Sequence, residues 1–244
     1  MSRVALVTGG SRGIGLAITQ SLKAAGYRVA IGYREGSPDT VADVAIAADL
    51  ASPAECISLV KKAEAALGPV EILVNNAGVL IRGDMDDFDQ SAFEKMRKIN
   101  VDGLVNVTKA VLPGMKNHQW GRIVNLTSIA AHGTAFAGTT FYAMTKSAVT
   151  MFTRRLAFDV GQFGITVNAI APGFIMTDMV TQGKTEEEVR QVVDLMSSRA
   201  MVRRVGETKD IAAAVRFLVS EDAGFMTAQV LTVDGGRMDY ISHP

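Results

Sequence analysis

The sequence predicts a single α/β domain, spanning residues 1–244, built on a parallel β-sheet that helices cover on both faces. Short apolar runs rich in Val and Ile alternate with longer helical patterns from one end of the chain to the other. Each run has the length of a buried parallel strand, and strand–helix alternation joins such strands into one sheet. A chain of 244 residues can bury a sizeable core, and no repeat, low-complexity segment or linker divides it.

Seven of the apolar runs are expected to be strands. Most of them lack an alternation of polar and apolar residues, which indicates that both faces of the sheet are buried. They are residues 4–8, 28–33, 44–48, 72–75, 122–126, 166–170 and 229–233.

Capping residues mark several helix ends. Residues 52–55 (Ser-Pro-Ala-Glu) combine an N-cap serine, a first-turn proline and a glutamate at the third position. Residues 185–188 (Thr-Glu-Glu-Glu) have the pattern of a capping box. Gly26 and Gly68 stand where helices are expected to end.

Composition restricts the class of protein. Hydrophobic residues make up 48% of the chain, which argues against disorder, and 25 basic residues balance 25 acidic ones without a long run of either sign. Nucleic acid and anionic membranes are therefore not expected as main partners. No stretch resembles a secretory signal or reaches the ~18 apolar residues of a spanning helix, so we expect a soluble, cytoplasmic protein. Cys56 is the only cysteine, and the three histidines are scattered, so neither an intrachain disulfide nor a metal site is expected.

The first predicted strand leads into a glycine-rich turn at residues 8–15 (Thr-Gly-Gly-Ser-Arg-Gly-Ile-Gly). Glycines allow a sharp turn and let a pyrophosphate approach the amides at a helix N-terminus. The spacing differs from the common Gly-x-Gly-x-x-Gly pattern, and any tight strand–helix connection can use such a turn. Its place in the first βαβ unit of a parallel sheet favours a nucleotide site.

The end of the second strand distinguishes between nicotinamide cofactors. An acidic residue there would bind the ribose hydroxyls, whereas an arginine favours a 2′-phosphate. Tyr33 ends the strand and Arg34 follows it, while Arg12 supplies a second cation from the glycine turn. We therefore expect NADP(H) in preference to NAD(H). Glu35 weakens this argument, and Arg34 could also be a solvated turn residue.

Tyr142 and Lys146 are four residues apart at the start of an apolar helical pattern, so they share one helix face. A free tyrosine has a pKa of about 10. A nearby ammonium and an oxidised nicotinamide would lower it, which suits a general acid that protonates a carbonyl oxygen as hydride arrives. The pattern alone is common. Ser128, however, follows a strand at the carboxyl edge of the sheet, where it could donate to a substrate oxygen.

Taken together, these motifs resemble the short-chain dehydrogenase/reductase family. The resemblance covers essentially the whole chain, with every motif in the family's order. The matching segments are residues 8–15, 75–78 (Asn-Asn-Ala-Gly), Asn100, Ser128, Tyr142 with Lys146, Pro172-Gly173, and 233–236 (Val-Asp-Gly-Gly). The resemblance implies a Rossmann-like, doubly wound sheet with strand order 3-2-1-4-5-6-7.

The resemblance also implies a role for each candidate catalytic residue. Tyr142 would be the general acid/base, and Lys146 would lower its pKa and hold the nicotinamide ribose. Ser128 would orient the substrate carbonyl, and Asn100 would hold a water that links Lys146 to solvent. The implied cofactor contacts are Gly9, Ser11, Arg12, Gly13, Ile14, Gly15, Arg34, Asp49, Leu50, Asn76, Ala77, Gly78, Tyr142, Lys146, Pro172, Gly173, Ile175 and Thr177.

Within the family, residues 8–15, 164–168, 171–179 and 204–207 are most similar to bacterial 3-oxoacyl-(acyl-carrier-protein) reductases. Gln119 and Phe163 stand where basic residues help those enzymes to dock the acidic carrier protein, and losing cations should slow that association. Lys116, Arg154 and Arg155 could compensate. The interval from Ser128 to Tyr142 is one residue longer than the usual family spacing.

We therefore expect a reductase of 3-oxoacyl thioesters or other small carbonyl compounds. Carrier-protein docking, coenzyme A thioesters, sugars or polyols, and simple ketones remain open as substrates. A catalytically silent nucleotide sensor is a remote alternative, since such proteins usually lose the Tyr, Lys or Ser. The resemblance also implies a homotetramer that pairs helices at residues 93–115 and 142–163. Residues 179–205 could form a lid over the substrate or a fixed surface helix.

Overall fold

In a computed structural model, which describes residues 2–36, 41–177, 183, 185–237 and 239–240, seven parallel strands form one sheet. Its order, β3-β2-β1-β4-β5-β6-β7, is that of a Rossmann-like fold, so the predicted fold class and strand order are confirmed. No strand end differs by more than two residues from its predicted position. The strands are β1 (Val4–Thr8), β2 (Arg28–Tyr33), β3 (Val44–Ala47), β4 (Val70–Asn75), β5 (Gly121–Leu126), β6 (Ile165–Pro172) and β7 (Val230–Val233).

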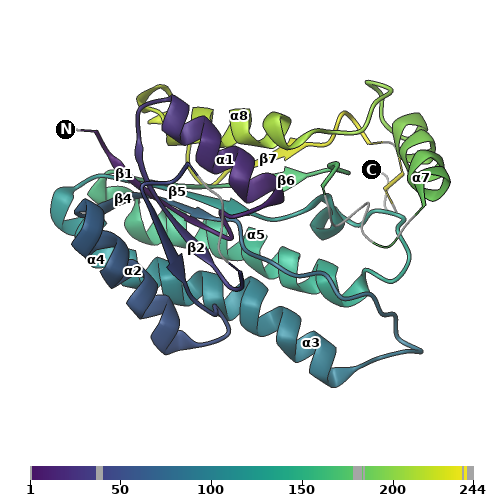
Figure 1. Ribbon diagram of the computed structural model, residues 1–244, viewed down its shortest axis with the longest axis horizontal. Helices are drawn as coiled ribbons and strands as arrows, with labels where there is room; N and C mark the ends of the chain where they lie inside the picture. Colours follow the sequence, from purple (N-terminus) through teal and green to yellow (C-terminus); the bar gives the residue numbers. More distant parts are fainter. Residues whose placement is uncertain (1, 37–40, 178–182, 184, 238, 241–244) are drawn as a thin grey trace.

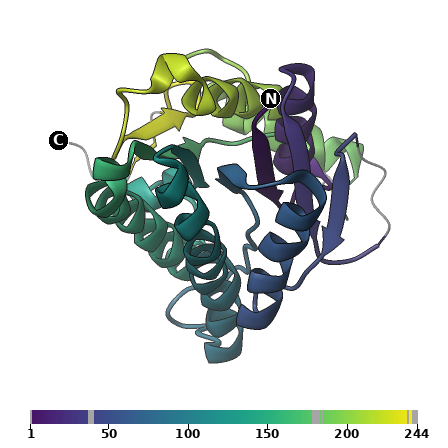
Figure 2. The same ribbon diagram turned by 90° about the vertical axis from the view of Figure 1, so that its left-hand side faces the viewer.

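Helices cover both faces of the sheet (Figures 1 and 2). One face carries α1 (Gly13–Ala24) and α8 (Thr208–Val219), and the other carries α2 (Pro53–Leu67), α4 (Leu104–His118) and α5 (Thr140–Val160). The shorter α3 (Gln90–Arg97) packs against α5, and α7 (Glu186–Ser198) lies beyond the carboxyl edge of the sheet. Within the described part of the chain, no helix has both the length and the apolar character needed to cross a membrane.

Two buried apolar clusters, one on each side of the sheet, account for the unbroken apolar character of the strands. Along β1, Val4 and Leu6 belong to the cluster under α2, α4 and α5. Ala5 and Val7 belong to the cluster under α1 and α8. Successive side chains of a strand point to opposite faces, so a strand covered on both faces needs an apolar residue at every position.

The predicted helix caps are present, with one difference in detail. Ser52 accepts a hydrogen bond from the backbone N–H of Glu55, and Pro53 begins α2. The Glu55 carboxylate does not complete a capping box, because it accepts from the backbone N–H of Asp49 at 2.8 Å. Glu55 thereby holds the turn that carries Asp49, a predicted adenine contact. The second capping box, Thr185 with Glu188, is complete at the start of α7.

The predicted helix at residues 93–115 is not continuous. A π-helical turn, Lys98–Gly103, separates α3 from α4. Within this turn the Asn100 amide binds the main chain of Val79, and Gly103 packs so closely that an added Cβ would lie 2.6 Å from the Leu50 carbonyl oxygen. These contacts join segments far apart in the sequence, so apolar periodicity could not reveal the interruption. Such turns occur frequently at functional sites.

A chain of buried side-chain hydrogen bonds crosses the sheet behind the end of β5. The Asn75 amide donates to Thr108 at 3.0 Å and to the Asn125 carbonyl oxygen at 2.9 Å, and the Asn125 amide donates to Thr153 at 2.9 Å. The chain therefore connects α4, β4, β5 and α5. These paired amides stabilise the fold, although the buried Asn75 side-chain oxygen has no hydrogen-bond partner among the described residues.

Replacing Asn125 with alanine should lower the free energy of unfolding by about 2–4 kcal/mol, because the Asn75 amide and Thr153 each lose a buried partner. Denaturant unfolding followed by circular dichroism would measure the change. Asn117→Ala, which truncates an exposed amide near the end of α4, should change it by less than about 0.5 kcal/mol. Equal stability of the Asn125→Ala and Asn117→Ala variants would contradict the assigned role.

Candidate active site

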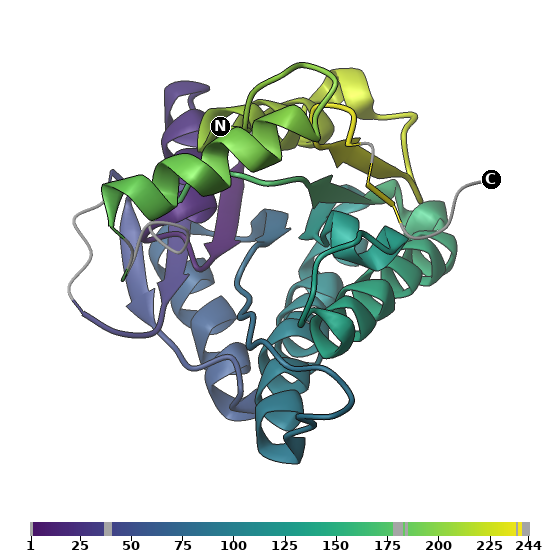
Figure 3. The same ribbon diagram turned by 90° about the vertical axis from the view of Figure 1, so that its right-hand side faces the viewer.

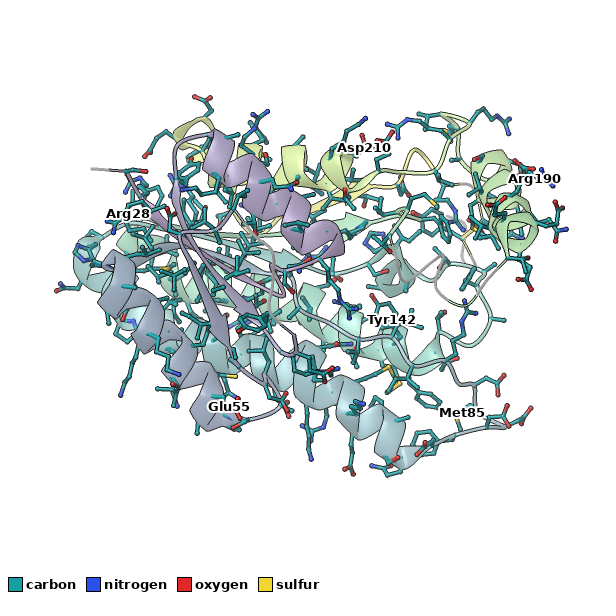
Figure 4. The ribbon with its side chains drawn as sticks, viewed as in Figure 1. Arg28, Glu55, Met85, Tyr142, Arg190 and Asp210 are labelled. Atoms are coloured by element: carbon teal, nitrogen blue, oxygen red, sulfur yellow. The ribbon has the colours of Figure 1, made fainter. Side chains whose placement is uncertain are left out.

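The candidate catalytic residues meet at the carboxyl edge of the sheet, the side that faces the viewer in Figure 3. Ser128 follows the end of β5, and Tyr142 and Lys146 lie in the first two turns of α5. Figure 4 shows Tyr142 inward from Arg190 of α7 and from the exposed loop that carries Met85. The structure therefore brings together residues from two elements, as expected from where β5 ends and α5 begins.

The Tyr142 side chain is half-buried and hydrogen-bonded to Ser128. Ser128 is itself fixed, because its hydroxyl oxygen accepts from the backbone N–H of Ala130 at 3.1 Å and caps the short 3₁₀ helix Ile129–His132. Burial raises the pKa of Tyr142 to about 12, and the Ser128 hydrogen bond opposes this increase only in part. Two hydroxyl groups thus lie side by side at the site.

The expected lowering of the Tyr142 pKa by Lys146 and a bound nicotinamide stays a prediction, while burial acts on the phenol in the opposite direction. The Lys146 ammonium nitrogen lies 5.7 Å from the centre of the Tyr142 ring. Lys146 is itself buried, and the loss of hydration lowers its pKa to about 8. The sequence could not show this result, because the helical spacing of the two residues says nothing of their depth.

Lys146 is held by neighbours that the motif does not include. Its ammonium donates to the Leu126 carbonyl at 2.8 Å, and its own carbonyl accepts from Thr127 at 2.9 Å. Gly78 borders it, since a Cβ added there would lie 3.3 Å from both the Lys146 nitrogen and the Asn100 side-chain oxygen. Lys146, Asn100 and Gly78 therefore form one compact group.

Asn100 makes three hydrogen bonds from the π-helical turn. Its oxygen accepts from the N–H of Val79 at 2.8 Å, and its amide donates to the carbonyl of Val79 at 2.9 Å and to Thr145 at 3.1 Å. The Thr145 hydroxyl in turn donates to the carbonyl of Tyr142 at 2.8 Å. Sequence reasoning missed Thr145, whose only signal is its position between Tyr142 and Lys146.

The glycine turn has a shape that accommodates a pyrophosphate. A Cβ on Gly15 would lie 2.0 Å from the Gly9 carbonyl oxygen, and Gly9 and Gly13 have φ values of +64° and +54°. Arg12 at the N-cap of α1 makes no side-chain capping bond, so the N-terminus of this helix is available to an anion. Beyond Gly13, an added Cβ would meet only Thr177, at 3.6 Å.

Asn76 supports this turn, as its motif suggested. Its amide donates to the carbonyls of Thr8 at 3.0 Å and Gly9 at 3.1 Å, and the backbone N–H groups of Asn76 and Ala77 both donate to the Thr8 hydroxyl. Of the other predicted contacts on this side, Ser11 and Ile14 lie in the turn and the first turn of α1. The segment after β4 is therefore fastened to the glycine turn.

The predicted cofactor-selecting residues lie at the ends of β2 and β3, which pair with each other. Arg34 is 47% exposed and forms an ion pair with Glu35 at 2.8 Å. Asp49 follows β3, where its carboxylate accepts from the N–H of Ala51 at 2.9 Å, and Leu50 beside it is buried. Arg12 is exposed on the glycine turn.

The opposite wall of the predicted cofactor site is the end of β6. Pro172 ends this strand, and Gly173 packs against Asp234 so closely that an added Cβ would lie 2.6 Å from the Asp234 α-carbon. Ile175 pairs with Gly206. Residues 179–182 and 184 of the predicted lid lie outside the described residues, so its role as a lid stays a prediction.

Comparison with known proteins identifies the family. A family model described as enoyl-(acyl carrier protein) reductase matches residues 9–237. An acetoacetyl-CoA reductase from Shinella zoogloeoides is 40% identical over 244 residues, which cover 97% of this chain and 99% of that protein. The chain belongs to the short-chain dehydrogenase/reductase family.

Further relatives agree with this assignment. A 3-oxoacyl-(acyl-carrier-protein) reductase from Staphylococcus epidermidis is 36% identical over 248 residues, covering 97% of this chain and 99% of the relative. The solved structure of a blue fluorescent protein from a metagenomic library, in complex with NADPH, has a TM-score of 0.85 and 37% identity. The structural match covers 96% of this chain and 97% of the metagenomic protein's chain.

As a short-chain dehydrogenase/reductase, the protein is an NAD(P)-dependent oxidoreductase that takes a nicotinamide cofactor and a small-molecule substrate. Among the residues that the structure describes, no group of three or more His, Cys, Asp or Glu side chains could hold a metal ion. Cys56 is buried, and burial raises the pKa of its thiol to about 11, which agrees with a packing role.

The two positions that lack the carrier-docking cations lie at the amino edge of the sheet, opposite Ser128 in this chain. Gln119 precedes β5 and Phe163 ends the 3₁₀ turn that follows α5. Lys116 lies beside Phe163, with its ammonium nitrogen 5.0 Å from the centre of the Phe163 ring. Arg155 is directed along α5, toward Asp159 at 4.0 Å and Phe158.

Proposed function

We propose that the protein uses NADPH to reduce short 3-oxoacyl thioesters, coenzyme A thioesters in particular, to 3-hydroxyacyl thioesters. The observation that carries the proposal is the hydrogen-bonded pair of Ser128 and Tyr142 above the buried Lys146. The likeness to the Shinella acetoacetyl-CoA reductase supports a thioester substrate. The NADPH complex of the metagenomic protein supports the cofactor.

In the proposed reaction the hydroxyls of Ser128 and Tyr142 bind the 3-oxo oxygen and orient the carbonyl. Bound NADPH supplies a hydride to the carbonyl carbon. Tyr142 gives its proton to the carbonyl oxygen, which completes the secondary alcohol. A phenol with a raised pKa is fully protonated near neutral pH, so it is ready to act as an acid.

Lys146 and Asn100 support the proton transfer. The positive charge of Lys146 stabilises the phenolate that Tyr142 leaves, and the same ammonium holds the nicotinamide ribose. Asn100, fixed by Val79 and Thr145, keeps a water path from Lys146 to solvent. A proton that reaches Tyr142 along this path after each reduction restores the phenol, so that the next turnover can begin.

The proposed cofactor contacts lie on the glycine turn, at the ends of β2 and β3, and after β4 and β6. The glycine turn and the N-terminus of α1 hold the pyrophosphate. Arg12 and Arg34 would hold the 2′-phosphate, and Asp49 and Leu50 would contact the adenine. Asn76, Ala77 and Gly78 line the adenosine side. Pro172, Gly173, Ile175 and Thr177 hold the carboxamide.

Coenzyme A is proposed over the acyl carrier protein because Gln119 and Phe163 supply no positive charge at the expected docking positions. A homotetramer is also proposed. Leu156 and Phe152 belong to the core or pack on it, but Met151 is 55% exposed and Phe158 is 77% exposed on the outer face of α5. Exposed apolar side chains on this helix suit a subunit contact.

NADPH oxidation in the presence of acetoacetyl-CoA tests the activity. Tyr142→Phe should lower kcat by about 10²–10⁴-fold, because the general acid is lost. Tyr27→Phe, at a half-buried tyrosine just before β2, should retain activity. A strong preference of the wild-type protein for polyols with NAD⁺ would contradict the thioester substrate. Equal inactivity of wild type and Tyr142→Phe on a broad carbonyl panel would favour a sensor.

The rate of reduction should fall as the pH rises through about 8, where Lys146 loses its proton. The protonated form stabilises the developing phenolate, so activity is present below this pH and lost above it. Plotting log kcat/KM between about pH 6 and about pH 10 would show the decline. Lys146→Met should have low activity without this step. A wild-type profile that is flat through pH 8 and 9 would disagree with the role of Lys146.

Arg34→Ala should raise KM for NADPH by about tenfold, the size expected for one lost charge-assisted hydrogen bond to a phosphate. KM for NADH should hardly change, because NADH lacks the 2′-phosphate. Arg28→Ala is a matched control: Arg28 is exposed at the opposite end of the same strand, far from Tyr142 (Figure 4). If Arg34→Ala changes both KM values equally, Arg34 does not select the cofactor.

A further inference from the structure

We infer that Asp239 is a positioning residue that joins α7 to the loop between Ser128 and Tyr142, and so sets the shape of the substrate side of the site. The inference rests on the proposed function and adds a determinant of substrate binding to it. The loop concerned, residues 133–139, is called here the pre-α5 loop. It lies within the interval that is one residue longer than the usual family spacing.

The Asp239 carboxylate is shared by two arginines. Arg237 donates to both of its oxygens, at 2.6 and 2.5 Å, and Arg199 donates to one of them at 3.1 Å. The side chains of Arg237 and Asp239 are only 4% and 16% exposed. Bidentate pairs between arginine and carboxylate are strong and directional, particularly when shielded from water. The Arg237 hydrogen bonds hold the pKa of Asp239 below its usual value, so the carboxylate is ionised near neutral pH.

These contacts fasten the end of α7. Arg199 is the residue that follows this helix, and the second terminal nitrogen of Arg237 contacts the sulfur of the buried Met196 at 3.7 Å. The backbone continues the attachment, because Arg237 pairs with Ala200 and Gly236 accepts from the N–H of Met201. In Figures 1 and 3, α7 lies at the carboxyl edge of the sheet, the same side of the molecule as the candidate active site.

The backbone beside the carboxylate fastens the pre-α5 loop. The carbonyl of Asp239 accepts from the N–H of Ala135 at 2.8 Å, and Tyr240 forms an antiparallel bridge with Thr134. The other side of the loop is held independently, because Gly83 donates to the carbonyl of Gly138 at 3.1 Å. The loop is thus attached at both ends of its length, and Asp239 provides one of the two attachments.

The same segment reaches the wall of the predicted nicotinamide site. The Tyr240 hydroxyl donates to Asp234 at 2.6 Å, and Asp234 packs directly on Gly173. Residues 237, 239 and 240 therefore contact the end of α7, the pre-α5 loop and Asp234, and Asp234 in turn packs against Gly173 after β6.

Loss of the Asp239 charge would leave Arg237 buried without its partner and release Arg199 at the end of α7. The pre-α5 loop would keep its hydrogen bond to Gly83, but Thr134 and Ala135, which contact Tyr240 and Asp239, would become less well ordered. The pre-α5 loop leads directly into the first turn of α5, which carries Tyr142. Because the described hydrogen bonds of Asp239 reach this loop and the end of α7 and none reaches the glycine turn, the acyl group should be affected more than the cofactor. Asp239 touches neither reacting group, so it acts through Ala135 and Arg199.

The test compares Asp239→Asn with wild type in the assay with acetoacetyl-CoA and NADPH. We expect kcat/KM for the thioester to fall about tenfold, mainly through KM, as for a lost buried charge-assisted hydrogen bond. KM for NADPH should change by less than about twofold. Asp239→Glu, which keeps the charge, should recover part of the loss. If Asp239→Asn does not fold, Arg199→Gln takes its place, because it removes only the more exposed of the two arginine partners. It should likewise raise KM for the thioester and leave KM for NADPH nearly unchanged.

Asp43→Asn is the matched control. The Asp43 carboxylate also joins a cation to a backbone N–H, with Lys23 and Val29 each at 2.7 Å, but it lies between α1, β2 and β3. Its loss should lower stability without changing KM for the thioester. An equal rise of KM in Asp43→Asn and Asp239→Asn would reduce Asp239 to a general stabilising residue and overturn the inference.

Hydrogen–deuterium exchange separates this inference from the proposed function. Asp239→Asn should increase exchange in residues 133–139 and 186–199, and Asp43→Asn should not. If the wild-type protein reduces no 3-oxoacyl thioester, the proposed function fails, while the exchange result still decides whether Asp239 joins the two segments. Unchanged exchange in both segments overturns the inference whatever the substrate.

Discussion

The hydrogen bond from the Lys146 ammonium to the Leu126 carbonyl joins α5 to the end of β5, and the geometry of the site depends on it. It places a cation inside the protein, where loss of hydration lowers its pKa to about 8. Thr127 strengthens the same joint by donating to the Lys146 carbonyl. With α5 held in this way, Tyr142 one turn earlier is brought to the hydroxyl of Ser128.

Behind this joint, the structure holds its polar groups by pairing them across elements. The amides of Asn75 and Asn125 connect α4 to α5 through the sheet, and Asn100 connects the π-helical turn to Val79 and Thr145. Each buried amide keeps its partners only if several elements are correctly placed. Stability and the arrangement of the site therefore arise from the same contacts.

The two sides of the site are built by different means. On the cofactor side the site is formed mainly by the backbone, since the glycine turn and the end of β6 leave no room for side chains at Gly15 and Gly173. On the substrate side, loops and α7 are held by side-chain ion pairs around Asp239. Backbone cradles suit a ligand common to a family, whereas side-chain contacts vary readily with the substrate.

The sequence by itself determined the seven strands, the glycine turn and the identity of the candidate catalytic residues. The strands, the glycine turn, Ser128, Tyr142 and Lys146 depend on apolar runs, local spacing and the positions where strands end, all of which are readable within short windows, whereas Asn100 was identified through the family resemblance. Only the tertiary structure decided that residues 98–103 form a π-helical turn, that the pKa of Tyr142 is raised, that Arg34 pairs with Glu35, and that Asp239 joins α7 to the pre-α5 loop. Most of these depend on burial or on contacts between residues far apart in the chain, and the pairing of Arg34 with its neighbour depends on side-chain conformation; a linear pattern shows none of them.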